Sequence, residues 1–337
     1  MSTRRPLGEM QKMMKSAPSE LVAINCTNGF GNWGASPPSQ TISDPVRRFL
    51  STSLSAGTQR AYAADLAHFR ASGRNIPCPP HALAEYLANL AATHATATIQ
   101  RRVAAIAKAH RALGYDDPCK AEIVQATMSG IRRTKSMAQR EAQALQRDDL
   151  FTVLGLMGDR TIDLRDKALL LIGFAGAFRR SELVGFDCGD VEPAGRGIVL
   201  HLRRSKTDQT GQGRKIAIPH GRTRWCPVRH LTDWITHAGI EQGPIFRSID
   251  RHGRIAPDRL SGDAVSTIIK RRVEAAGFDP ASFSGHSLRA GLATSAAMAG
   301  ASSWKIRQQT GHKSDAMLAR YIRDGDMFTD NAAGTIL

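Results

Sequence analysis

The chain has 337 residues, of which 42% are hydrophobic, and this length favours two domains with sizeable cores over one. Its 46 Lys and Arg residues against 30 Asp and Glu residues give a formal charge of +16, which favours a polyanionic partner. The longest apolar run, around residues 168–177, is too short to cross a bilayer, and no apolar segment after residues 1–6 indicates a secretory signal. The 5 cysteines are scattered without a C-x-x-C pair, which predicts reduced thiols of a cytoplasmic protein.

The first part of the chain predicts an arm followed by a helical domain. Residues 1–43 mix Met, Ser, Asn, Gly and Pro without a sustained period, which is typical of a disordered arm. Residues 44–134 are expected to form short helices that start at Asp44, Ser55, Pro80, Thr96 or Thr98, and Asp117. Their basic faces supply candidate DNA contacts at Arg101, Arg102, Lys108, Arg132 and Arg133. A merely solvated helix surface explains any single one of these cations equally well.

A polar, charged stretch without aromatics, residues 135–146, predicts a linker to a second domain over residues 147–337. Residues 162–175 predict a strongly apolar helix at the centre of the second core. Arg179 and Arg180 follow that helix directly. An arginine pair in this setting predicts that at least one of the two faces a functional cleft or pairs with Glu182.

A β-hairpin is expected next in this domain. Residues 197–202 alternate and are β-branched, and residues 214–219 predict the partner strand. The turn between them carries Arg203, Arg204 and Lys206. A lysine on a hairpin tip is normally solvated, but in a DNA-cleaving enzyme it reaches the scissile phosphate. Helices are expected to open at residues 226–227 and at Asp263, with a short strand at 245–246 between them. The sequence shows no phosphate-binding loop and no dinucleotide-binding glycine pattern.

The last sixth of the chain gathers cations around a tyrosine. His286 and Arg289 lie at i and i+3, so they share one stripe of a helix. A stripe at helical spacing, Leu288, Leu292, Ala296 and Ala299, is expected to face the core. A second helix is expected from residue 302 or 303 to Gly311, before His312, and a third from Ser314 through Tyr321. A tyrosine on an apolar stripe is usually a core residue, whereas a tyrosine among cations can attack a phosphate.

Taken together, these residues resemble the tyrosine recombinase family, which includes phage integrases and the Xer and Cre recombinases. The resemblance covers most of residues 45–330. It rests on the Arg-x-Ser-Glu-Leu box at 179–183, the His-x-x-Arg box at 286–289, the Gly-His pair at 311–312, and a tyrosine nine positions later. Residues 55–69 resemble the helical core-binding (SAM-like) domain of the family, although Ala71-Ser72-Gly73 stands where members often have a tryptophan.

The resemblance implies a fold and a set of catalytic residues. The fold is mainly α with a small β-sheet, and the two domains form a clamp around DNA. The implied catalytic residues, with one supporting carboxylate, are Arg179, Lys206, His286, Arg289, His312, Tyr321 and, in support, Glu182. Tyr321 would attack the scissile phosphate to form a 3′-phosphotyrosyl link, and the two arginines would bind the non-bridging oxygens. His286 would assist proton transfer, and His312 would donate a hydrogen bond to the phosphate. Lys206 would protonate the leaving 5′-oxygen, with Lys215 on the same hairpin as the alternative.

The resemblance also implies partners. They are a double-stranded recombination site, a homotetramer that exchanges strands through a Holliday junction on two such sites, and accessory directionality factors. The family mechanism uses no metal and no cofactor, and it involves no membrane. The tail after Tyr321 is expected to dock on a neighbouring subunit, and a cytoplasmic protein of bacterial, phage or mobile-element origin is expected. A type IB topoisomerase-like DNA-relaxing enzyme and a catalytically inactive DNA-binding relative are the alternatives.

Overall fold

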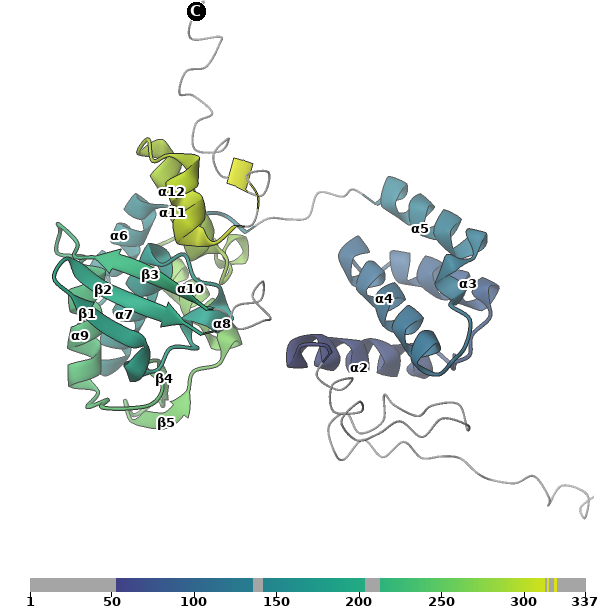
Figure 1. Ribbon diagram of the computed structural model, residues 1–337, viewed down its shortest axis with the longest axis horizontal. Helices are drawn as coiled ribbons and strands as arrows, with labels where there is room; N and C mark the ends of the chain where they lie inside the picture. Colours follow the sequence, from purple (N-terminus) through teal and green to yellow (C-terminus); the bar gives the residue numbers. More distant parts are fainter. Residues whose placement is uncertain (1–52, 136–141, 204–212, 313, 315–317, 320–337) are drawn as a thin grey trace, which may run out of the picture. The chain divides into compact units, whose positions relative to one another are not determined.

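The computed structural model describes residues 53–135, 142–203, 213–312, 314 and 318–319. The chain divides into two compact units, Met1–Gln139 and Arg140–Leu337, and each has its own hydrophobic core. The architecture is mainly helical with two small sheets, as the sequence predicts (Figure 1). None of the described helices combines the length and apolar character that a bilayer span requires.

The first unit is a small helical domain. Its described elements are α2 (Ala56–Ala71), α3 (Pro80–Ala91), α4 (Thr96–Ala112), the 3-10 turn η1 (Pro118–Lys120) and α5 (Glu122–Thr134). Ser55 opens α2, because its hydroxyl accepts a hydrogen bond from the Thr58 amide at 3.3 Å. Asp117 caps the short turn η1 rather than the long helix expected there, and α5 begins only at Glu122. The predicted helix start at Asp44 lies outside the described residues.

One predicted DNA contact in this unit is turned inward. Arg102 is buried, with its Nε 3.5 Å from Asp65 and its Nη1 3.1 Å from a ring nitrogen of His68. Asp65 is itself buried and also accepts two hydrogen bonds from Arg101, at 2.8 and 3.0 Å. A buried carboxylate in a helical core needs cationic partners, so Arg102 lies on the inner face of α4 instead of the exposed face predicted for it.

The second unit contains most of the described structure. Its elements are α6 (Arg147–Gly155), α7 (Thr161–Ala175), α8 (Arg180–Leu183), η2 (Cys188–Asp190), β1 (Val191–Ala194), β2 (Gly197–Leu202), β3 (Arg214–Pro219), α9 (Pro227–His237), β4 (Arg247–Ile249), β5 (Ile255–Arg259), α10 (Gly262–Ala275), η3 (Pro280–Ser282), α11 (Ser287–Met298) and α12 (Ser303–Thr310). Helix α7 is the central element: residues 168–172 are buried, and the helix packs against α8, α9 and α11. The apolar run predicted as the core helix therefore takes that place.

The predicted hairpin is present and belongs to a three-stranded antiparallel sheet of order β1-β2-β3. Gly197 pairs with Pro219 at one end and Leu202 pairs with Arg214 at the other, next to the connecting turn. The strand expected at residues 245–246 is shifted to β4, which pairs with β5. Ile245 instead donates its backbone N–H to the carbonyl of Phe186 at 3.1 Å, and both Ile245 and Phe246 are buried, so the two residues expected to form the strand fill the core.

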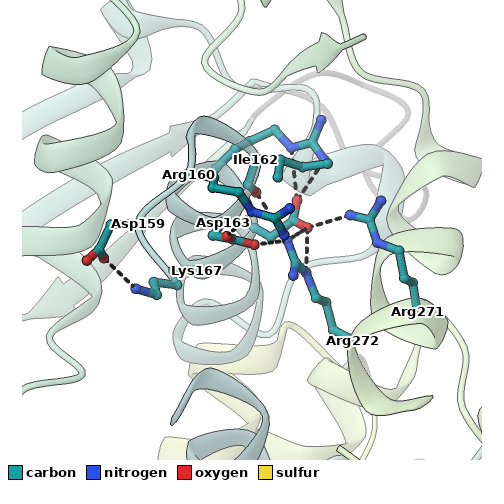
Figure 2. A network of polar contacts seen from close by, with 9 residues as sticks. Asp159, Arg160, Ile162, Asp163, Lys167, Arg271 and Arg272 are labelled. Carbon is teal, nitrogen blue, oxygen red and sulfur yellow. Dashed lines mark hydrogen bonds and ion pairs between the residues drawn. The ribbon is translucent and has the colours of Figure 1, made fainter. Parts of the chain in front are cut away.

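A buried ionic network joins α7 to α10 (Figure 2). The carboxylate of Asp166 is fully buried and accepts hydrogen bonds from Arg165 at 2.7 and 3.0 Å, from Arg271 at 2.7 Å and from Arg272 at 2.7 Å. Arg272 also lies 2.7 Å from the buried carboxylate of Asp163. Helix α7 leads into the arginine box and α10 leads toward the His-x-x-Arg box, so this network fixes the supports of the two boxes relative to each other.

Part of the predicted linker packs on the second unit. The amide of Gln143 donates to the carbonyl of Ser282 at 2.8 Å, and the amide of Leu145 donates to that of Ser287 at 3.0 Å. Leu145 is fully buried in the core. A Cβ at Gly291 of α11 would lie 1.8 Å from the Leu145 carbonyl oxygen, so a glycine is required at this crossing. Residues 142–146 are thus an edge of the second unit.

Candidate active site

The turn between α7 and α8 holds Arg179 in place. Glu182, buried in α8, accepts the Arg179 amide at 2.9 Å with one carboxylate oxygen and the Arg179 guanidinium at 2.6 Å with the other. These two charge-assisted hydrogen bonds fix both the backbone and the side chain of the arginine. The expectation that an arginine of the pair meets Glu182 is therefore confirmed. Arg180 points elsewhere, because its guanidinium lies 3.0 Å from Asp263 at the start of α10.

Arg289 reaches the same turn from α11. Its side chain is fully buried, and its Nη1 donates to the carbonyl oxygen of Ala177 at 2.8 Å. Ala177 has φ +50°, a left-handed conformation that costs a non-glycine residue about 1–2 kcal/mol. The strained residue lies in the turn between α7 and α8. Its carbonyl accepts the hydrogen bond from Arg289, and the same turn continues into Arg179. The sequence shows no signal for it, since the strained residue is an alanine.

The orientation of α11 differs from the prediction. The expected inward stripe holds at Leu288, but Leu292 is only partly buried and Ala299 is exposed. Residues 288–291, 293, 294 and 297 are buried instead, because α11 packs against α6, α7 and α12 together. His286 stands at the N-terminal edge of this helix, exposed, with its backbone N–H bonded to the Ser284 hydroxyl at 3.1 Å. One helix therefore presents a buried arginine and an accessible histidine on neighbouring turns.

His312 follows α12 and is nearly buried, with 8% of its surface exposed. Its Nδ1 lies 2.8 Å from the Thr310 hydroxyl. Burial, together with the nearby positive charges of Arg289, Arg179, His286 and Arg214, lowers the pKa of His312 to about 4. Three arginines and the His286 ring therefore act electrostatically on one imidazole. His312 is neutral at physiological pH and offers one ring N–H rather than a charge.

The shift in His312 has a consequence for stability. The ordinary histidine pKa is 6.5, so between pH 6.5 and about 4 the unfolded chain binds a proton that the folded site refuses. The stability associated with the neutral ring is complete above pH 6.5. It is lost progressively as the pH falls toward 4.

Arg214, at the start of β3, belongs to this cluster although no sequence motif marked it. Its guanidinium donates to the carbonyl oxygens of Gln308 and Thr310 at 3.2 and 3.4 Å, at the end of α12. Burial lowers the pKa of Arg214, while Glu182 raises it and Arg179 lowers it. A cation is favourable at a helix C-terminus, and Gly311 does predict such a terminus, but the sequence does not say which distant cation meets it.

The structure does not describe every predicted site residue. Lys206, Arg204 and Tyr321 lie outside the described residues. Arg203 is exposed and donates to Asp190 at 2.6 Å. Leu318, three positions before Tyr321, is fully buried among Ala293, Ala297 and Ile306 of α11 and α12.

The remaining candidate cations of the first unit differ in exposure. Lys108 is partly buried on α4, whereas Arg132 and Arg133 are exposed in the last turn of α5. Among the described residues, no group of three or more His, Cys, Asp or Glu side chains could hold a metal ion.

Comparison with known proteins identifies the family. The model of the phage integrase family matches residues 143–326, which include every motif of the second unit. The chain is 39% identical over 303 residues to the integrase/recombinase xerD homolog of Selenomonas ruminantium, and the match covers 87% of this chain and 89% of that protein. The chain belongs to the phage integrase family. It is a tyrosine-type site-specific recombinase, and this assignment favours recombination over the topoisomerase-like and inactive alternatives.

Other relatives of the recombinase are more distant. The recombinase cre of Escherichia phage P1 is 28% identical over 206 residues, which are 56% of this chain and 59% of that protein. A lambda integrase dimer bound to a COC′ core site superposes with a TM-score of 0.59 at 17% identity, over 85% of this chain and 77% of that chain. The XerH recombinase bound to a palindromic difH substrate superposes with a TM-score of 0.62 at 16% identity. This match covers 84% of this chain and 81% of that chain. At these identities the structural likeness shows a shared fold.

Proposed function

We propose that this recombinase cuts and rejoins DNA at a specific duplex site through a covalent 3′-phosphotyrosyl link made by Tyr321. The observation that carries the proposal is that Arg179 and Arg289, each held by hydrogen bonds, act with His286 on the neutral His312. Two fixed arginines and one neutral donor suit a phosphate that gains negative charge as a fifth oxygen approaches.

In this mechanism the phenolate oxygen of Tyr321 attacks phosphorus, and the bond from phosphorus to the 5′-oxygen breaks. The phenol proton passes to His286, which is the accessible histidine of the site. Arg179 and Arg289, rigidly held by Glu182 and by the Ala177 carbonyl, bind the non-bridging oxygens. Attack by another 5′-hydroxyl on the phosphotyrosine reverses the step. No nucleotide is consumed, because the phosphotyrosyl link retains the energy of the broken phosphodiester bond.

His312 contributes a hydrogen bond to the phosphate in this scheme. A neutral imidazole carries one N–H, so Nε2 can donate to phosphate only when Nδ1 accepts a proton from its other partner. The Thr310 hydroxyl, 2.8 Å from Nδ1, is placed to be that donor. A Thr310 hydroxyl that donates to Nδ1, rather than to the Arg307 carbonyl at 3.5 Å, would favour the tautomer that the reaction needs.

Lys206 is proposed as the acid that protonates the leaving 5′-oxygen. The alternative, Lys215, is 70% exposed and lies 3.8 Å from Glu192 on β1. Successive side chains of a strand point to opposite faces, and Arg214 uses the face that meets α12. Lys215 therefore points away from His312, and the hairpin turn is the better source of the acid.

The assembly and the partners are part of the same proposal. A lambda integrase tetramer bound to a Holliday junction shares the fold at a TM-score of 0.57, which supports a tetramer of this recombinase on two duplex sites. Residues 327–337 are proposed to dock on a neighbouring subunit. Accessory directionality factors and a cytoplasmic location in a bacterial cell complete the proposal, and the relative from Selenomonas ruminantium supports the bacterial origin.

The test traps the covalent intermediate. Full-length protein is incubated with nicked duplexes prepared from DNA that flanks its gene, since a nick near the cleavage site lets the short 5′-hydroxyl strand diffuse away. Protein–DNA adducts are isolated under denaturing conditions, and the attached DNA is sequenced. We expect one recurrent site, loss of the adduct in Tyr321→Phe, and no loss in the control Tyr115→Phe, an exposed tyrosine of the first unit. An adduct that survives Tyr321→Phe refutes the nucleophile. Plasmid relaxation without strand exchange between two sites would favour the topoisomerase-like alternative.

A further inference from the structure

The C-terminal end of α12 is closed by a side chain from the distant hairpin. The last four carbonyl groups of a helix have no partner within it. Here the carbonyl of Arg307 accepts the Gly311 amide at 2.7 Å. The guanidinium of Arg214 takes the other three, from Gln308, Gln309 and Thr310, at 3.2, 3.4 and 3.4 Å. A positive charge at this end also opposes the helix dipole, so Arg214 acts as a cap across 94 or more positions of sequence.

A second contact fastens the same turn. The side-chain amide of Gln309 donates to the carbonyl of Ala175, at the end of α7, at 2.8 Å. It also reaches the carbonyl of Ala217 on β3 at 3.2 Å. The last turn of α12 is therefore tied to β3 at two points, through Arg214 and through Ala217, and to the helix that leads into the arginine box.

Gly311 adapts the backbone to this cap. Its φ of +69° is the left-handed conformation that ends many helices. A Cβ at this position would lie 2.5 Å from Nη1 and 2.7 Å from the central carbon of the Arg214 guanidinium. The chain thus turns close against the Arg214 guanidinium, and the next residue is His312. The glycine is needed for its conformation and for the room that Arg214 occupies.

We propose that Arg214 is a positioning residue for His312: by capping α12 it sets the place from which the imidazole addresses the scissile phosphate. The inference rests on the proposed function, in which His312 donates to that phosphate. Arg214 binds Thr310 through its carbonyl, and the hydroxyl of Thr310 meets Nδ1 of His312, so one chain of contacts runs from β3 to the ring. Because its Nη1 and Nη2 donate to carbonyl oxygens of α12, Arg214 in this proposal acts through the histidine rather than on DNA.

A double-variant experiment distinguishes this positioning role of Arg214 from a direct catalytic role. Single-turnover cleavage of the trapped site is measured for full-length wild type, Arg214→Gln, Arg214→Lys, His312→Ala and the double variant Arg214→Gln/His312→Ala. We expect Arg214→Gln to slow cleavage by about 10- to 100-fold, as misplacement of a reacting group by an ångström does. DNA affinity should stay within about twofold, because the hydrogen bonds of Arg214 join parts of the protein to each other and not to DNA. Arg214→Lys should recover part of the rate, since an ammonium still reaches a helix-end carbonyl.

The decisive comparison is made without the histidine. In the His312→Ala background, Arg214→Gln should slow cleavage by no more than about twofold, because residues that act through one group are not additive. A full 10-fold or greater effect in that background means that Arg214 acts on the DNA itself and overturns the proposal. A fall in affinity that accounts for the whole loss of rate overturns it as well.

Two further arms exclude simpler explanations. A substrate with sulfur at the 5′-bridging position has a leaving group that needs no acid. It should therefore restore cleavage by the Lys206→Ala variant. If the same substrate also restored cleavage by Arg214→Gln, Arg214 would only support the hairpin lysine, and the proposal would be wrong. Arg196→Gln, an exposed arginine in the turn at the other end of the sheet, is the matched control and should cleave like wild type.

Failure of the inference can be told from failure of the proposed function. If wild type gives no adduct that depends on Tyr321, the proposed function fails. If wild type gives the adduct and Arg214→Gln cleaves at the same rate while its thermal midpoint equals that of wild type, only the positioning role fails.

Discussion

The buried carboxylate of Asp166 permits a sharp prediction about stability. It receives hydrogen bonds from Arg165, Arg271 and Arg272 while being fully buried, and Arg165 and Arg272 are themselves 5% and 11% exposed. Asp166→Asn keeps the shape and removes the charge. Breaking a buried ion pair costs about 3–5 kcal/mol, and here it leaves buried Arg165 without its carboxylate, whereas Arg272 keeps Asp163. The bond to Arg271, which is 48% exposed, adds little to this figure because water can replace it.

An exposed aspartate near this network gives the control. Asp159 pairs with Lys167 at 3.2 Å, but its side chain is 92% exposed. Asp159→Asn should therefore cost less than about 1 kcal/mol. Calorimetric unfolding of the full-length variants measures both effects, and the transition of the first unit serves as an internal reference that neither substitution should move.

The same comparison is repeated with added salt, and two outcomes would refute the prediction. Added salt should leave the loss in Asp166→Asn nearly unchanged, because buried charges are screened much less than exposed ones. Equal losses in the two variants, or a loss below about 1 kcal/mol in Asp166→Asn, would refute the view that burial makes this network indispensable.

Three further predictions concern the site and its surroundings. His312→Gln should lose less stability than wild type when the pH falls from 6.5 to about 4. Chemical denaturation at each pH measures the free energy of unfolding of both proteins. An equal loss in the two would contradict a neutral, buried ring. Gly291→Ala should destabilise by about 1–3 kcal/mol or more through its backbone clash, whereas Gly189→Ala, with open space around it, should be neutral in thermal unfolding. Arg132→Gln should reduce the salt slope of DNA binding by about 1, and Arg102→Gln should lower the unfolding midpoint without changing that slope.

Local patterns predict much of the second unit. The apolar run of α7, the alternating strands β2 and β3 and the helix end at Gly311 follow from short-range preferences, and the structure confirms each. The arginine and histidine boxes were recognised from order and spacing. The structure brings Arg179, Arg289, His286 and His312 into one electrostatic cluster, which spacing alone could not establish.

What the sequence missed depends on contacts between distant segments. Arg102 has the residue type of a surface cation, and only the buried Asp65 turns it inward. Arg214 carries no local signal for capping a helix about 94 positions later in the chain. The left-handed Ala177 is invisible for a similar reason, because its strain is maintained by the packing around it and by the bond from Arg289.

The way residues 142–146 join the second unit bears on where a separately expressed catalytic fragment should begin. The first helix suggests a start at Arg147, but that cut removes Leu145, a fully buried side chain whose loss leaves a cavity costing about 2–5 kcal/mol. It also removes the amides that bond to Ser282 and Ser287, the carbonyls on either side of His286. A fragment trimmed to the helix would thus be damaged beside His286, and one that begins at residue 142 keeps this edge intact.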